Sequence, residues 1–241
     1  MEVSSRDGRF STTRWSVVLA AGGAGDRTGA LKALCETYWR PVYAFIRRSG
    51  HSADEASDLT QAFFLRVLEQ EFFSFARRDR GRFRSFLLAS VRHFVANVHE
   101  QQRASKRGGG VPHLSLMFVV GEREYSLEPV ERLTPERLYE RQWGLTILSE
   151  ALDRVAREYS ESGRGALFTS LRPFITGDQD VAYATLASDL GMSPGAVRVA
   201  VHRLRQQCGR SLRTLIADTV SDVDDVDREL EYLLRVLSEP H

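Results

Sequence analysis

The sequence contains very little cysteine and almost no lysine. Its two cysteines, Cys35 and Cys208, stand far apart and outside any CxxC pattern. This spacing provides neither a disulfide framework nor a cysteine-based zinc site, so we expect two buried or incidental free thiols. Of the 33 basic residues, only Lys32 and Lys106 are lysine. Arginine suits bidentate contacts with phosphate and guanine, although a codon bias of the genome explains the same composition equally well.

Long hydrophobic runs and catalytic motifs are also missing. No apolar stretch approaches the ~20 residues that a membrane span requires, and residues 1–15 lack the basic-then-apolar order of a secretory signal. We therefore expect no contact with a membrane and a cytoplasmic location. The six histidines include no HExxH pair, and neither a Walker loop nor an acidic cluster at two-metal spacing occurs. The sequence predicts neither an enzyme nor a bound metal or cofactor.

Charge is unevenly distributed along a chain whose net charge is only +1. Residues 1–110 carry 18 basic and 11 acidic side chains, whereas residues 217–241 carry two basic and eight acidic ones. A basic half and an acidic tail can have different partners, because each attracts surfaces of the opposite sign. The length of 241 residues suffices for one large core or for two small domains.

Almost every periodic segment has the 3.6-residue repeat of a helix, so the sequence predicts an all-α fold. In the first half we expect helices at about 13–21, 29–48, 53–69 and 83–103. Pro41 should kink or break the second of these helices. Ser52 and Glu55 have the spacing of a capping box at the start of the third. The arginine-rich string ARRDRGRFR (76–84) interrupts the pattern and predicts a basic loop.

Three consecutive glycines at 108–110 divide the chain, since they cost too much backbone entropy for a helix interior. The expected parts are a helical domain at 1–107, a glycine-containing linker at 108–133, a second helical domain at 134–217 and an acidic helical extension at 218–241. Within the linker, LSLMFVV (114–120) can form a short strand or an apolar plug. Thr134 and Pro135 should begin a helix at 135–159, and one further helix is expected at 163–176.

Residues 183–206 have the pattern of a helix-turn-helix. Gly191 suits the left-handed turn between two helices, and Ser193 suits the cap of the second. Ala187 lets the two helices approach, and Val197 fills the space between them. The second helix has a polar, basic face of the kind that reads the major groove; a solvated face in another helical hairpin is the alternative. The residues expected to contact DNA are Ser193, Arg198, His202, Arg203, Arg205 and Gln206.

Three segments, in order, resemble the sigma-70 family of RNA polymerase subunits. DLTQAFFLRVL (58–68) is similar to the D-L-x-Q-x-x-F-L signature of region two, and FRSFLLASVRHFVAN (83–97) is similar to the helix that follows it. The 183–206 segment resembles region four, which reads the −35 promoter element. Without a region three, the layout resembles the extracytoplasmic-function (ECF) group. The strings TRWSVVLAA (13–21), KRGGG (106–110), TPERLYERQW (134–143) and GAVRVAVHRLR (195–205) resemble a subgroup with a C-terminal extension.

The resemblance implies a non-catalytic subunit that binds core RNA polymerase and directs it to promoter DNA. In the family, the region-two signature binds the clamp of the polymerase β′ subunit. This role carries over to Asp58, Gln61, Phe64, Leu65 and Arg66, although Phe64 fits plain core packing equally well. Region four is expected to contact the β flap, but Val155 and Ala156 stand where the family has a Leu-Pro pair.

The basic loop and the helix after it match in position the family's site for the melted −10 element. The resemblance carries contacts with a single DNA strand to Arg77, Arg78, Arg80, Arg82, Arg84, Arg92, His93, Asn97 and Gln101. Phe83 can stack on a base if it is exposed, and a merely solvated loop is the alternative. The family usually has Asn and Asp where this chain has His93 and Asn97, and Glu100 replaces a common arginine. These departures predict a different −10 preference.

The acidic extension carries an apolar stripe on a short helix, formed by Val226, Leu230, Leu233, Leu234 and Leu237. Such a helix is marginal alone and needs a surface to dock on. Either it restrains DNA or polymerase binding, in place of a separate anti-sigma factor, or it simply extends the region-four fold. For the whole chain, the competing function is a helix-turn-helix regulator that binds a palindromic operator as a dimer, without polymerase.

Overall fold

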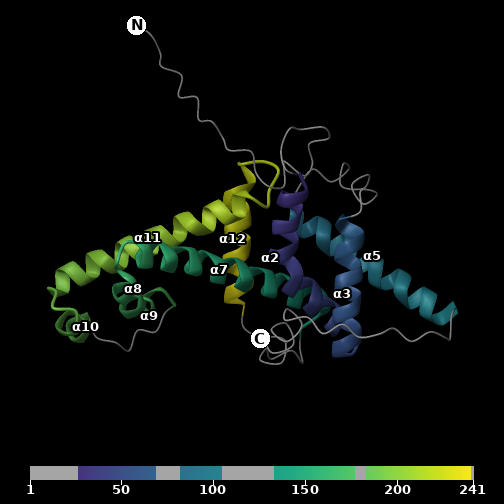
Figure 1. Cartoon of the computed structure of the whole chain (residues 1–241), viewed down its shortest axis with the longest axis horizontal. Helices are drawn as coiled ribbons and strands as arrows, with labels where there is room; N and C mark the ends of the chain where they lie inside the picture. Colours follow the sequence, from purple (N-terminus) through teal and green to yellow (C-terminus); the bar gives the residue numbers. More distant parts are fainter. Residues whose placement is uncertain (1–26, 69–81, 105–132, 177–182, 240–241) are drawn as a thin grey trace, which may run out of the picture. The chain divides into compact units, whose positions relative to one another are not determined.

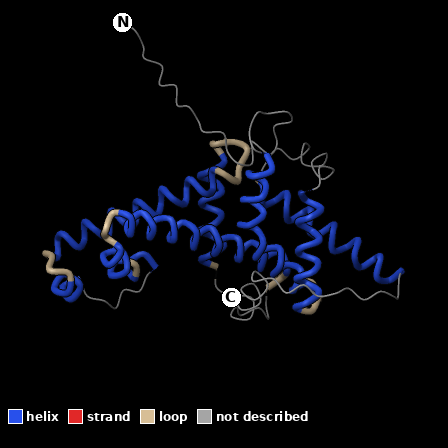
Figure 2. Tube along the Cα trace, viewed as in Figure 1, coloured by secondary structure: helices blue, strands red, loops and turns tan. Residues whose placement is uncertain are grey.

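The computed structural model describes residues 27–68, 82–104, 133–176 and 183–239. Every regular element in these ranges is a helix, which confirms the all-α prediction (Figures 1 and 2). In chain order they are α2 (Arg27–Arg48), α3 (Ala53–Leu68), α5 (Phe83–Ala104), α7 (Pro135–Glu161), α8 (Gly165–Leu171), α9 (Pro173–Thr176), α10 (Tyr183–Asp189), α11 (Pro194–Ala217) and α12 (Asp225–Ser238). The helix expected at 13–21, the apolar string 114–120 and most of the linker lie outside the described residues.

The chain divides into two compact units that are discontinuous in sequence. Unit 1 comprises the chain up to Tyr139 together with Ala217–Asp225, and unit 2 comprises Glu140–Ile216 together with Val226–Pro240. This division differs from the expected one in two places. The first turn of α7 belongs to unit 1, and the acidic extension contributes its beginning to unit 1 and its helix α12 to unit 2.

The core of unit 1 is aromatic and is formed by α2, α3 and α5. The ring of Tyr38 on α2 meets the ring of Phe83 edge-on at 4.9 Å, and Phe63 on α3 lies 5.6 Å from Phe94 on α5. Tyr38, Phe63 and Phe83 are all fully buried. Edge-to-face pairs of this kind add to the free energy gained by burial. They fix the start of α5 against α2.

Pro41 does not end α2, contrary to one of the two outcomes expected for it. The helix continues from Arg27 to Arg48 with Pro41 inside it. Proline removes one backbone hydrogen bond from a helix interior. Pro41 and the residues after it are buried, including Val42 and Ile46, which have no solvent exposure. This burial offsets the lost bond, so tertiary packing overrides the local preference.

The predicted helix caps of unit 1 are present. Ser52 N–H donates to the Glu55 carboxylate at 2.9 Å, and Glu55 N–H donates to the Ser52 hydroxyl at 3.3 Å, which is a capping box. The same backbone bond from Ser52 holds the pKa of Glu55 below its ordinary value. Thr134 caps α7 through a 3.3 Å bond from Arg137 N–H, and Pro135 occupies the first helical position. These four residues confirm the predicted starts of α3 and α7.

Unit 2 is a layer of short helices packed on α7 and α11. Its core contains Val155 and Tyr159 from α7, Phe168 and Leu171 from α8, and Leu204 from α11. The single helix expected at 163–176 is wrong, because the segment forms α8 and α9 with a break at Arg172. Pro173 causes the break, since it has no N–H to continue the α8 hydrogen-bond ladder.

Helix α12 packs in unit 2 through a face that differs from the expected stripe. Val226 and Leu233 are buried as predicted, but so are Glu229 and Val236. Leu234, expected on the apolar face, is 53% exposed. The helix lies close to α7, because a Cβ atom added at Gly144 would meet the Leu237 side chain at 3.1 Å. The docking surface that this short helix needs is therefore provided by the chain itself.

Both cysteines are buried free thiols, as expected. Burial raises the pKa of the Cys35 thiol to about 12. Among the helices described, none combines the length and the apolar character that crossing a membrane requires.

Candidate nucleic-acid interface

The turn between α10 and α11 has the geometry of a helix-turn-helix. Gly191 is in the left-handed conformation, at φ +61°, and its N–H donates to the Ser188 carbonyl at 3.2 Å. Met192 N–H donates to the Ala187 carbonyl at 2.9 Å, which completes a Schellman motif at the end of α10. The Ser193 hydroxyl then accepts the Ala196 N–H at 3.2 Å and caps α11. The sequence predicted the left-handed turn at Gly191 and the cap at Ser193, but not the bond between Met192 and Ala187.

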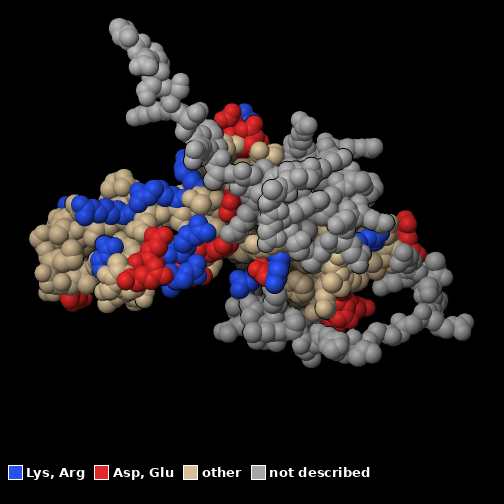
Figure 3. Space-filling view, turned by 45° about the horizontal axis from the view of Figure 1, so that its top comes forward, with Lys and Arg blue, Asp and Glu red and all other residues tan. Residues whose placement is uncertain are grey.

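Burial separates the two faces of α11 as the sequence predicts. Val197, Val201 and Leu204 are buried against the rest of unit 2, and Ala187 on α10 is buried beside them. The outward side, which we call the recognition face, consists of Arg198, Val199, His202, Arg203 and Gln206, all exposed. In Figure 3, basic side chains follow one another along the edge of unit 2 where α11 runs. A row of cations on a projecting helix suits contact with a DNA groove.

Val199 also lies on the recognition face, but it was not among the residues predicted to contact DNA. It is 49% exposed. The helical periodicity contained the signal, because Val199 precedes His202 and Arg203 by three and four positions.

Arg198 and Arg205 differ in how they are held. The guanidinium of Arg198 lies over the Tyr183 ring, 5.7 Å from its centre, which is within the range of a cation–π contact. Arg205 instead donates from Nε at 3.2 Å and from Nη2 at 2.7 Å to the carbonyl oxygen of Phe174 in α9. Arg205 therefore fastens α9 to α11. Arg205 is nevertheless exposed, so its expected contact with DNA stays a prediction beside this structural role.

Replacement of Arg205 by alanine is expected to lower the free energy of unfolding by about 1–2 kcal/mol, because it leaves the Phe174 carbonyl without both bonds. Urea unfolding of the two proteins measures the difference. Arg203→Ala, an exposed change on the same helix, serves as the control and should cost less than about 0.5 kcal/mol. Equal stability of the two variants, with altered base preference in Arg205→Ala, would leave only the DNA-reading role.

The outer face of α5 retains only part of the expected −10 site. His93 and Asn97 are exposed, and Arg92 is exposed but donates to Glu136 on α7 at 3.0 Å. Arg84 is only 4% exposed, so its assignment to DNA is wrong: amphipathic spacing placed it outside, whereas the packed helix turns it inward. Phe83 is fully buried and is not available to stack on a base. Arg77, Arg78 and Arg80 and the side chain of Gln101 lie outside the described residues.

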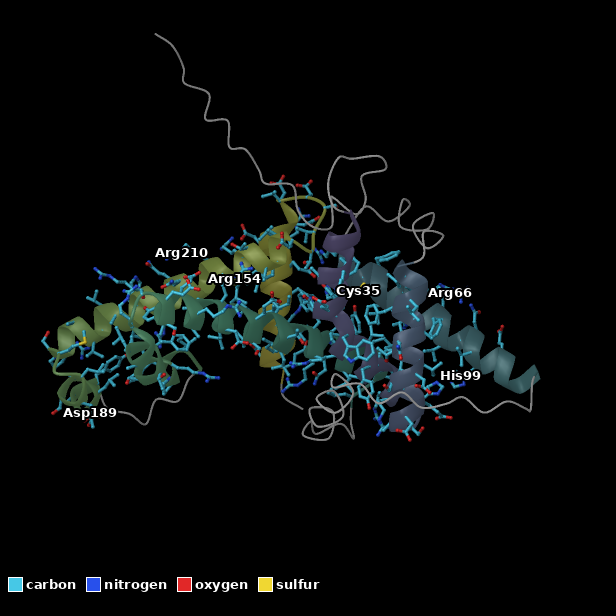
Figure 4. All side chains as sticks on the ribbon, in the orientation of Figure 1. Cys35, Arg66, His99, Arg154, Asp189 and Arg210 are labelled. Atoms are coloured by element: carbon cyan, nitrogen blue, oxygen red, sulfur yellow. The ribbon has the colours of Figure 1, made fainter. Side chains whose placement is uncertain are left out.

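The segment of α3 that resembles the region-two signature has an exposed stripe. Four of its residues are exposed, and we call them the signature face: Asp58, Gln61, Leu65 and Arg66. Arg66 is labelled on α3 in Figure 4. Leu65 is 57% exposed and is the apolar member of this face. Phe64 is instead buried and stacks on Trp39 at 5.8 Å. Its assignment to the polymerase contact is therefore wrong.

No group of three His, Cys, Asp or Glu side chains in the described ranges is arranged to hold a metal ion. Comparisons of the chain with family models, with curated proteins and with solved structures found no match.

Proposed function

We propose that this chain is an ECF-type sigma factor, a subunit that binds core RNA polymerase and directs it to promoters. The observation that carries the proposal is the signature face on α3. A helix-turn-helix by itself is common to many DNA-binding proteins. The exposed face of Asp58, Gln61, Leu65 and Arg66 supports a second, separate contact, because these residues match the polymerase-binding signature that the sequence resembles and are open to a protein partner.

We assign one binding role to each exposed face of the described helices. The signature face binds the β′ clamp, the recognition face on α11 reads the −35 element in the major groove, and the outer face of α5 with His93 and Asn97 meets the −10 element. No catalytic role is assigned to any residue, since the polymerase supplies the chemistry. A polymerase subunit acts in the cytoplasm at the nucleoid, and an anti-sigma factor is a further expected partner.

The alternative remains a helix-turn-helix regulator that binds an operator by itself. The recognition face supports both functions, whereas only the sigma factor uses the signature face. The two functions differ in what DNA binding requires. Binding of duplex promoter DNA should be weak for the free protein and strong in the presence of core polymerase, measured by electrophoretic mobility shift. Tight operator binding that core polymerase leaves unchanged would favour the regulator.

A further inference from the structure

The beginning of the acidic extension is bound to the start of α5 in unit 1. We call this segment, Ala217–Asp225, the strap. Phe83 N–H, in the first turn of α5, donates to the Thr219 carbonyl at 2.9 Å. Arg82, which immediately precedes α5, pairs with Val220 in an antiparallel bridge, and its guanidinium lies 3.7 Å from the Asp225 carboxylate. Backbone and side-chain contacts thus both join the strap to Arg82 and Phe83.

The strap has an anchored part and an acidic part. Thr219 and Val220 are buried in unit 1. Beyond them, Asp222 and Asp224 are exposed, and the ion pair between Arg82 and Asp225 is partly open to solvent, with side-chain exposures of 27% and 25%. The strap carries four aspartates and no basic residue. Buried apolar contacts cost much to break, whereas a solvated ion pair costs little.

We infer that the acidic part of the strap is an intramolecular occupant of the single-strand surface at the start of α5, and that a DNA strand must displace it to reach Arg82. The inference rests on the proposed function, and it extends the proposed −10 contact from His93 and Asn97 to Arg82, which precedes the same helix. A carboxylate and a phosphate compete for the same guanidinium.

Neutralising the strap tests this competition. The variant Asp222→Asn/Asp225→Asn removes two charges, and asparagine keeps an Oδ1 atom for the 3.0 Å bond that Asp222 accepts from Asp224 N–H. We expect it to bind a single-stranded oligothymidine of about 12 nucleotides roughly three- to fivefold more tightly than the unaltered full-length chain. Fluorescence anisotropy at fixed ionic strength measures the affinity, because salt alone changes it.

The control removes two acidic charges from unit 2. Asp153→Asn/Glu231→Gln changes exposed residues of α7 and α12, so a general effect of net charge would raise affinity equally in both variants. An equal rise, or no rise in the strap variant, overturns the inference. Circular dichroism melting shows whether each variant remains folded.

Hydrogen exchange of the unaltered chain provides a second, independent readout. Displacement predicts that saturating oligothymidine speeds amide exchange in the peptide covering 221–225, because the strap loses its contact with Arg82. Slower exchange there would mean that the strap supports the bound strand, which overturns the inference. Neither readout uses polymerase. If the strap results hold while transcription fails, the proposed function alone fails, and the converse outcome refutes only the strap.

Discussion

Replacing Leu65 by aspartate is expected to weaken binding to core RNA polymerase at least about tenfold, because one buried hot-spot side chain is worth that much at a protein interface. Leu65 is the apolar centre of the signature face and is 57% exposed. A carboxylate there would have to be desolvated against the partner. The exposed position predicts an unchanged unfolding temperature. The affinity is measured by binding of the soluble variant to core polymerase immobilised on a surface.

The chain offers a matched control in Leu234, which is 53% exposed on α12. Leu234→Asp makes the same chemical change at nearly the same exposure, on a helix to which no polymerase contact is assigned. It should bind core polymerase with the affinity of the unaltered chain. A similar loss in both variants, or in neither, contradicts the assignment of the β′ contact to α3.

Replacing Arg198 by alanine is expected to reduce the rate of initiation about 10- to 100-fold at promoters that carry the preferred base at one upstream position. At promoters in which that base is already changed, the reduction should be much smaller. The expected cause is loss of a bidentate contact to guanine from a guanidinium that Tyr183 holds in place. Transcription from a set of single-base variants of one promoter measures the pattern. Uniform loss on all of them would show that Arg198 touches phosphate only.

Arg210 is the control for this experiment. It is exposed on the same helix, about 18 Å further along its axis. Arg210→Ala removes the same charge at a distance from the helix start that enters the groove. We expect a modest loss that is equal on every promoter variant, together with a reduced dependence on salt. A base-specific loss in Arg210→Ala would mean that the residues that read the bases lie in the C-terminal half of α11.

Local chemistry determined which parts of the structure could be predicted. The capping box at Ser52 and Glu55, the glycine turn at Gly191 and the cap at Ser193 involve residues within a few positions of one another, so sequence alone specifies them. The two prolines show the limit of such rules. Pro173 coincides with the break between α8 and α9, whereas Pro41 stays inside α2, although both prolines have buried neighbours, such as Leu171 and Val42.

The contacts that sequence reasoning missed connect distant residues. Arg205 reaches the carbonyl of Phe174, 31 positions earlier, and Phe83 bonds to Thr219 far along the chain. Amphipathic periodicity also does not decide whether a residue at the boundary of the apolar face is buried or exposed. Phe64 and Arg84 lie at such edges and are buried, and Leu234 lies at another and is exposed. No pattern within one helix decides these cases, because the neighbouring elements set the buried face.

The central claim is that this chain lets RNA polymerase begin transcription at promoters. Run-off transcription with purified bacterial core polymerase over a library of promoter sequences tests it most directly. We predict transcripts only when the chain is added, from templates that share an upstream and a −10 element, and none with Leu65→Asp. Absence of transcripts from every template, with binding of duplex DNA by the free chain intact, would contradict the account and favour the operator-binding regulator.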